Sequence, residues 1–319
     1  MKSVPNAYPV ESEAPDISAY KAGNTGVDYY TSFDSGQPGP HVLVNALVHG
    51  NELCGAIALD HLFGTGFRPL KGKLTLGFSN TEAYEAFDPE DPTTTRYLDE
   101  DFNRVWDVST LDGERESREL TRAREIRPLI ETVDYLLDIH SMQHKTPPLM
   151  ISGPLDKGRA LARTVASPAY IVSDAGHKAG RRLRDFGGFG DPASDKNALL
   201  IECGQHWESA AGPVAIDSVY RFLIHFGLAD RDAVAKHLLP LPDSQTLIEV
   251  DGPVTIQTEE FRFAQEFTGM ETLAKDELIG WDGEEEVRAP FDGCVLIMPT
   301  RRIWKGQTAV RLGRVIPAG

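Results

Sequence analysis

A His and a Glu stand three residues apart directly after a strongly apolar stretch, in the motif His49-Gly-Asn-Glu52. Residues 42–48, just before the motif, are an almost unbroken apolar run, which is typical of a strand buried on both faces of a parallel sheet. In open α/β sheets, ligands bind beyond the carboxyl ends of the strands. The motif therefore predicts an α/β fold with a site at that edge of the sheet.

Two more apolar runs end in the same kind of residue. Residues 133–139 lead into His140, and residues 198–201 lead into Glu202. Because the carboxyl ends of parallel strands share one edge of a sheet, we expect these side chains to lie beside the His49 motif. Three separate segments would then build a site that exists only in the folded chain.

The residue types at these strand ends indicate metal chemistry. Two imidazoles and one carboxylate form a catalytic zinc donor set that leaves a fourth position open, so we expect one Zn²⁺ per chain on His49, Glu52 and His140. Glu202 is then the natural general base, which takes a proton from the attacking water and passes it to the leaving group. Taken singly, each residue has an ordinary alternative: His49 as a hydrogen-bonded core residue and Glu52 as a first-turn acid favoured by the helix dipole.

Four motifs in this order resemble the succinylglutamate desuccinylase/aspartoacylase family, which belongs with the zinc carboxypeptidase-like hydrolases. They are His49-Gly-Asn-Glu52, Thr95-Arg-Tyr-Leu-Asp-Glu-Asp-Phe-Asn-Arg104, Asp138-Ile-His140 and Ile201-Glu-Cys-Gly204. The resemblance covers roughly residues 40–319. It implies zinc on the two His and Glu52, with Glu202 as the base.

The resemblance also implies roles for three residues of the second motif. Arg96 would steady the oxyanion, and Asn103 and Arg104 would hold a substrate carboxylate. The chemistry agrees, because a guanidinium matches a carboxylate in a bidentate way and a fixed cation stabilises a developing oxyanion. The alternative for Arg96 and Arg104 is a surface salt bridge within an acidic loop.

These roles predict a zinc-dependent hydrolase that cleaves the amide bond of an N-acyl amino acid or a related small amide with a free carboxylate. The alternatives are a zinc carboxypeptidase acting on short peptides and a non-catalytic ligand- or metal-binding protein. Residues 189–196 lack the Arg that aspartoacylases carry there, and no Tyr follows Pro290, which argues against N-acetylaspartate. Other cations could bind an anionic group instead: Lys178, Arg181, Arg182, Arg184 and Lys196.

Composition limits the partners of the chain. A net charge of −16 over 319 residues argues against a nucleic-acid partner, which needs clustered Lys and Arg. No run reaches the ~20 apolar residues that a membrane helix needs, and the first residues lack the apolar core of a signal peptide. The three cysteines form no Cys-x-x-Cys pair and are expected to be reduced in a cytoplasmic protein. A homo-oligomer is left open.

We predict a zinc hydrolase domain over residues 1–240, built on a mixed, mainly parallel sheet flanked by helices, and a small all-β domain over 241–319. Strands are expected at 27–33, 41–48, 73–78, 133–139, 148–152 and 169–173. Helices are expected at 52–63, 114–130, 157–166 and 213–226. Residues 1–26 are expected to form an extended lead-in, residues 81–112 a long polar loop, and residues 184–196 a flexible Gly-rich loop.

Overall fold

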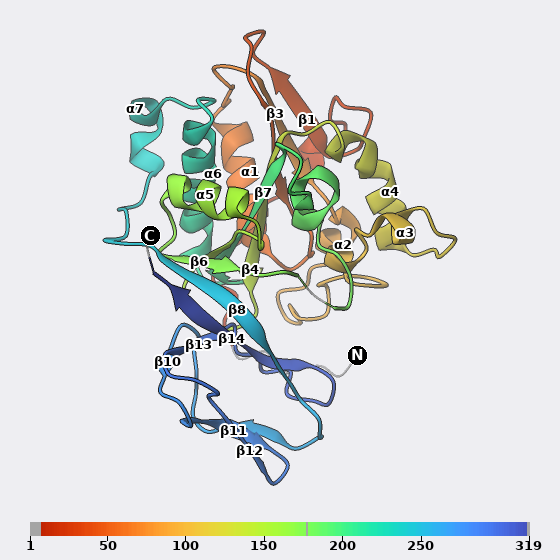
Figure 1. The fold of residues 1–319 in the computed structure, drawn as a ribbon. Coiled ribbons are helices and arrows are strands. Elements are labelled where there is room, and N and C mark those ends of the chain that lie inside the picture. Colours follow the sequence, from red (N-terminus) through yellow and green to blue (C-terminus); the bar gives the residue numbers. More distant parts are fainter. Residues whose placement is uncertain (1–7, 177, 318–319) are drawn as a thin grey trace.

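The computed structural model describes residues 8–176 and 178–317, so the first seven residues of the predicted lead-in lie outside it. A large mixed sheet runs through the molecule, and Figure 1 shows helices packed around its upper part. In spatial order its strands are β1 (Tyr30–Asp34), β3 (Lys73–Phe78), β2 (His41–Ala46), β4 (Tyr135–Met142), β7 (Asn197–Gln205), β5 (Leu149–Ile151), β6 (Tyr170–Ser173), β8 (Thr246–Thr255), β14 (Thr308–Ile316), β13 (Cys294–Ile297) and β10 (Thr272–Leu273).

The centre of this sheet is parallel, as the apolar runs predict. Strands β3, β2, β4 and β7 pair in parallel, whereas β1 pairs antiparallel with β3, and β5 pairs antiparallel with β7 and parallel with β6. Every residue of β7 is buried, and so is every residue of β2 after His41. The register places His140 of β4 directly beside Glu202 of β7. Two of the predicted site residues are therefore neighbours across one strand pair.

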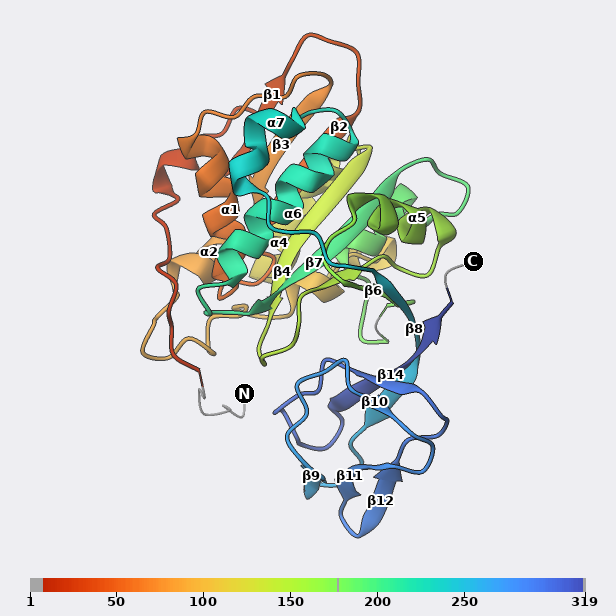
Figure 2. The same ribbon diagram turned by 90° about the vertical axis from the view of Figure 1, so that its left-hand side faces the viewer.

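Helices cover both faces of the central strands because successive side chains of a strand point to opposite faces. Val42 and Val44 belong to the apolar cluster that contains α1 (Leu53–Gly64), α5 (Asp156–Val165) and α6 (Ala211–His225). Leu43 belongs to the cluster that contains α4 (Arg118–Ile130). Figure 2 shows α6 lying across one face of β4 and β7.

The predicted small β region is present, but it is joined to the central sheet. Strand β8 pairs in parallel with β6 at one end and antiparallel with β14 along most of its length. It carries the sheet into the lower lobe of Figure 1. A separate antiparallel sheet there contains β12 (Glu285–Arg288), β11 (Leu278–Asp282) and β9 (Phe261–Phe263).

The predicted long loop of residues 81–112 contains short helices. They are α2 (Thr81–Glu85), η2 (Phe102–Arg104) and α3 (Val108–Leu111). Helix α4 begins at Arg118, four residues later than predicted, because the Ser117 side chain accepts a hydrogen bond from Leu120 N and caps the helix. The remaining short helices are η1 (Ser18–Tyr20), α7 (Arg231–Val234) and η5 (Ala235–His237).

The segment 184–196 differs from the predicted flexible loop. It contains η3 (Leu183–Asp185) and η4 (Gly187–Gly190), and Phe186 and Phe189 are buried. Lys157 Nζ donates to four backbone carbonyl oxygens of this region at 2.6–3.0 Å, those of Gly188, Asp191, Ser194 and Lys196. The ammonium group of Lys157 therefore holds this segment against α5.

Two predictions from composition can be compared with the described part of the chain. No helix within it is both long enough and apolar enough to span a membrane. Cys54, Cys203 and Cys294 are buried free thiols, as expected from their spacing and surroundings.

Candidate metal centre

Three of the predicted ligands meet at the carboxyl edge of the sheet. One nitrogen from each of His49 and His140 and one oxygen of Glu52 lie within 4.8 Å of one another, and all three side chains are buried. Glu52 stands between the imidazoles: its Oε1 is 2.7 Å from His49 Nδ1, and its Oε2 is 2.9 Å from His140 Nδ1. The site unites the turn after β2 with the end of β4, as the sequence predicts.

Each imidazole is held from behind by an aspartate. His49 Nε2 lies 2.9 Å from Asp101 Oδ1, and His140 Nε2 lies 3.0 Å from Asp138 Oδ2. Each carboxylate accepts a hydrogen bond from the Nε2–H group of its ring, which leaves the lone pair on Nδ1, facing Glu52. The two rings are therefore oriented as metal-binding histidines usually are.

The charges of this cluster favour a bound cation. Burial opposes ionisation of Glu52, but the two imidazoles hold the pKa of this carboxyl well below its ordinary value. Burial also opposes a charge on His140, yet Asp138 and Glu52 raise the pKa of its imidazole well above the ordinary value. Three carboxylates surround the two rings, and the donor set of two imidazoles and a carboxylate suits a divalent ion such as zinc.

The turn that carries His49 and Glu52 depends on close backbone packing. Leu47 has a φ of 59°, which turns the chain sharply after β2. A Cβ at Gly50 would lie 2.3 Å from the carbonyl carbon of Ala83 and 2.6 Å from Thr95 O. Glycine is therefore required at this position, which explains the second residue of the motif.

Glu202 lies beside the ligand group without belonging to it. Its side chain is buried, and its Oε2 has no hydrogen-bond partner in the described part of the chain. Burial, together with the neighbouring Glu52 carboxylate, raises the pKa of Glu202 to about 8. A carboxyl with a free oxygen and a raised pKa is suited to accept and donate a proton near neutral pH.

The structure brings the second motif to the same place. Arg96 Nη1 is 3.0 Å from Glu52 Oε1, so its guanidinium lies against a candidate ligand. Asn103 Oδ1 accepts from Leu183 N at 2.9 Å, which leaves the amide nitrogen of Asn103 as the donor for another group. Arg104 Nη1 donates to the Asn103 carbonyl at 2.7 Å.

Arg104 stands among other cations. Within the described residues, its guanidinium makes no ion pair closer than 4 Å. Burial lowers the pKa of Arg104, and the nearby guanidiniums of Arg96, Arg182 and Arg311 lower it further, whereas the Asp101 carboxylate acts against them and raises it. The surface salt bridge that the sequence allows for Arg104 is therefore not seen, and the region would favour an anionic ligand.

The β lobe touches the catalytic edge through the loop between β13 and β14. Arg301 N donates to His144 Nε2 at 2.8 Å, in the loop that follows β4. Arg311 of β14 lies 3.5 Å from Asp174 of the central domain. Burial lowers the pKa of Arg302, and so does the nearby Arg96 guanidinium. The lobe therefore places an extra cation within electrostatic reach of the site.

Sequence reasoning gave no role to several residues at this centre. Asp138 stands two residues before His140 in the same motif. Residues two apart in a strand point to the same face, so a contact between these two side chains could have been predicted. Asp101 is harder to predict, because it lies far from His49 in the sequence.

Ser141 and His206 form a further contact beside the candidate ligands. Ser141 Oγ and His206 Nδ1 lie 2.8 Å apart, and burial lowers the pKa of His206 to about 3.

Most of the basic residues considered as an alternative anion site are already paired. Buried Arg182 contacts Asp174 and Asp185, and Arg184 contacts Asp185 and two backbone carbonyls. Lys196 Nζ donates to two carbonyls near β4, and Arg181 pairs with Asp107. Lys178 borders a surface hollow of about 300 Å³ together with Arg181. These pairs make Arg182, Arg184 and Lys196 structural cations.

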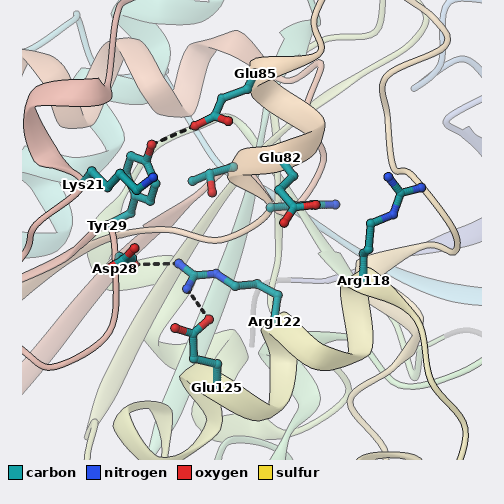
Figure 3. A pocket seen from close by; sticks show the side chains of 10 residues that line it. Lys21, Asp28, Tyr29, Glu82, Glu85, Arg118, Arg122 and Glu125 are labelled. Atoms are coloured by element: carbon teal, nitrogen blue, oxygen red, sulfur yellow. Dashed lines mark hydrogen bonds and ion pairs between the residues drawn. The ribbon is translucent and has the colours of Figure 1, made fainter.

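A separate hollow of about 270 Å³ lies between the segment before β1, helix α2 and helix α4 (Figure 3). Its charged groups largely satisfy one another: Tyr29 donates to Glu85 at 2.8 Å, and Arg122 pairs with Glu125 at 2.7 Å. Arg122 also donates to three backbone carbonyls, including that of Asp28. Most of its charged side chains therefore pair with one another, and none of the candidate ligands His49, Glu52 and His140 lines it.

Comparisons with known proteins agree on one family. The model of the succinylglutamate desuccinylase/aspartoacylase catalytic domain matches residues 38–206, more than half of the chain. A succinylglutamate desuccinylase of Vibrio cholerae serotype O1 is 22% identical over 285 residues, which cover 84% of this chain and 79% of that protein.

Solved structures with the same fold include two that cover most of both chains. A succinylglutamate desuccinylase from Silicibacter sp. TM1040 has a TM-score of 0.63 at 20% identity, and the match covers 90% of this chain and 88% of that one. The product-bound ectoine utilization protein EutE (DoeB) from Ruegeria pomeroyi has a TM-score of 0.63 at 17% identity, with 92% of each chain covered. At these identities the likeness establishes the fold.

Proposed function

This chain belongs to the succinylglutamate desuccinylase/aspartoacylase family, and we propose that it is a zinc-dependent deacylase of an N-acyl amino acid or a related small amide with a free carboxylate. The observation that carries the proposal is the buried group of His49, Glu52 and His140 beside Glu202, whose Oε2 lacks a partner in the described residues. A donor set and a proton carrier at one sheet edge are the two parts that amide hydrolysis needs.

His49, Glu52 and His140 would hold the ion. Zinc in this donor set supplies Lewis acidity toward a carbonyl and lowers the pKa of water. Asp101 and Asp138 fix the two rings through their Nε2 atoms. These contacts keep the Nδ1 atoms directed at the position between the rings and Glu52.

Glu202 would accept the proton of the attacking water and deliver it to the departing nitrogen, which must leave as a neutral amine. Arg96, which contacts Glu52 at 3.0 Å, would stabilise the negative charge that develops on the carbonyl oxygen. Arg104 and the amide nitrogen of Asn103 would hold the substrate carboxylate. Together these groups fix the substrate at both ends of its scissile bond.

We take residues 1–240 as the catalytic domain and 241–319 as the β domain. The proposed ligands and base all lie in the first, whereas the second contributes Arg302 near Arg96. The two solved relatives named above carry different names, a desuccinylase and an ectoine utilization protein, so the acyl group is best identified by assay.

Replacing His140 by Ala should lower zinc affinity by more than ~10-fold. Loss of a residue that only hydrogen-bonds to a metal ligand already costs at least about that much, and His140 would be a ligand itself. The expected cause is loss of one of three protein ligands. Zinc affinity can be measured by competition with a chromophoric chelator, and circular dichroism checks the fold. His225→Ala, which changes an exposed imidazole at the end of α6, is the control. Equal affinity of wild type and His140→Ala would contradict the ligand assignment.

The proposed function is tested with zinc-loaded protein on three substrate panels. The first contains N-acyl amino acids with different acyl groups, the second their primary amides, and the third short unacylated peptides. We expect hydrolysis of the first panel and little of the second. Preference for the third would favour the carboxypeptidase alternative, and zinc binding without hydrolysis of any panel would favour a binding protein.

A further inference from the structure

Glu119 is a buried carboxylate that no mechanistic step uses. It lies in the first turn of α4 and is fully buried. Its oxygens accept four N–H hydrogen bonds, from Asn80 Nδ2 (3.1 Å), Leu98 N (2.8 Å), Asp99 N (3.1 Å) and Glu100 N (3.2 Å). Within the described residues, no cation pairs with it at ion-pair distance.

This arrangement requires a carboxylate. Two acceptor oxygens meet two donors each, whereas a glutamine would turn its own NH₂ group toward two N–H donors. A buried acid without hydrogen bonds would be strongly unfavourable, so the four donors explain how the fold tolerates Glu119. In turn, Glu119 holds the backbone N–H groups of residues 98–100 in one place.

Those three amides lie between two residues that contact the candidate metal ligands. Arg96 precedes them and lies 3.0 Å from Glu52, and Asp101 follows them and lies 2.9 Å from His49 Nε2. The other end of the segment is tied to the motif turn, because Gly50 N donates to Arg96 O at 3.0 Å. The segment is thus held at two points.

Asn80 extends the connection to strand β2. Its backbone N donates to Leu47 O at 2.8 Å, just before the turn that carries His49, while its side chain donates to Glu119. The residue therefore links the turn, α4 and the 98–100 segment. Asn80 also lines the hollow described above.

We propose that Glu119 is a positioning residue for the metal centre, which fixes the 98–100 segment so that Asp101 orients His49 and Arg96 stays against Glu52. The inference rests on the proposed function for its catalytic meaning, but its effect on metal affinity can be measured without any substrate. Glu119 acts through Asp101 and Arg96, and its four hydrogen bonds include none to the three candidate ligands.

A neighbouring contact offers a matched control. Arg118, the residue before Glu119, pairs with Asp99 of the same segment at 2.6 Å, but both side chains are exposed. Figure 3 shows Arg118 extending from the outside of α4. Solvent screens such a pair, so Arg118→Ala should leave the segment in place and zinc affinity unchanged.

The experiment is a double-mutant cycle on zinc affinity, measured by chelator competition with the full-length metal-free protein. Glu119→Gln should weaken zinc binding by ~10- to 100-fold, as expected for loss of a partner outside the coordination sphere. Asp101→Asn should cause a similar loss. Because Glu119 acts partly through the same Asp101–His49 contact, the double variant should be weaker than Asp101→Asn by clearly less than the full loss caused by Glu119→Gln alone.

Hydrogen exchange of the peptide containing residues 96–104 provides a second measurement, in which Glu119→Gln should accelerate exchange and Arg118→Ala should not. Unchanged zinc affinity in Glu119→Gln, or losses that add fully in the double variant, would overturn the proposal. So would a wild-type chain that binds no zinc. Where Glu119→Gln does not fold, Glu119→Asp replaces it, since it keeps both acceptors at a shorter reach. Zinc binding with this pattern but no deacylation would refute the proposed function alone.

Discussion

Replacing Glu202 by Gln should lower kcat by at least ~100-fold while the protein keeps its zinc, because general acid–base catalysis contributes ~10²–10⁴-fold. The substitution keeps the size of the buried side chain but removes its ability to accept a proton. Steady-state kinetics on the best substrate of the panels, with zinc content measured in the same samples, gives the result. Glu249→Gln, which changes an exposed carboxylate paired with Arg159, should leave kcat unchanged.

The pH dependence of this result has a definite sign. Burial raises the pKa of Glu202 to about 8 in the absence of metal, so the proton is held near neutral pH. A bound divalent cation favours the ionised carboxylate and should move this pKa downward. Activity of the zinc-loaded enzyme should therefore fall as the pH drops through the pKa of Glu202. Unchanged turnover in zinc-loaded Glu202→Gln would remove Glu202 from the mechanism.

The meeting of the three candidate ligands at one sheet edge could be predicted from the sequence, because each of them follows a recognisable strand. His49, Glu52 and His140 each follow an apolar run, and parallel strands bring such ends to one edge. Asp101 and Glu119 could not be predicted in the same way, because their partners lie on other segments and meet them only through the path of the 95–104 loop. The hydrogen bonds of Glu119 to residues 98–100 are visible only in the folded chain.

Secondary structure could likewise be predicted where it depends on residues close together in the sequence, but not where it depends on contacts between distant segments. Strand β3 was predicted with its observed limits, since its apolar pattern stands between clear turn residues. The short helices α2 and α3 were missed, because helices of one turn are stable only through tertiary contacts. The pairing of β8 with β6 was also not predicted, since the two strands are more than 70 residues apart in the sequence and meet only through long-range packing.

Replacing Arg104 by Ala should lower kcat/KM on a free carboxylate substrate by roughly 30-fold to several thousand-fold, which corresponds to the ~2–5 kcal/mol lost with one buried charge pair. Arg104 makes no ion pair in the described part of the chain, and the guanidiniums near it outnumber the Asp101 carboxylate, so a substrate carboxylate would add negative charge where cations are in excess. On the primary amide of the same substrate, the loss should be small. The measurement compares two enzymes on two substrates.

The comparison separates binding of the carboxylate from a structural role of Arg104. A structural defect would damage turnover of the acid and the amide alike, whereas loss of a carboxylate contact affects the acid selectively. Arg181→Ala is the matched control, because this exposed guanidinium on a neighbouring segment is already paired with Asp107. It should leave the preference for the acid intact. Equal losses on both substrates in Arg104→Ala would make Arg104 a structural cation and would remove the main support for a carboxylate-bearing substrate.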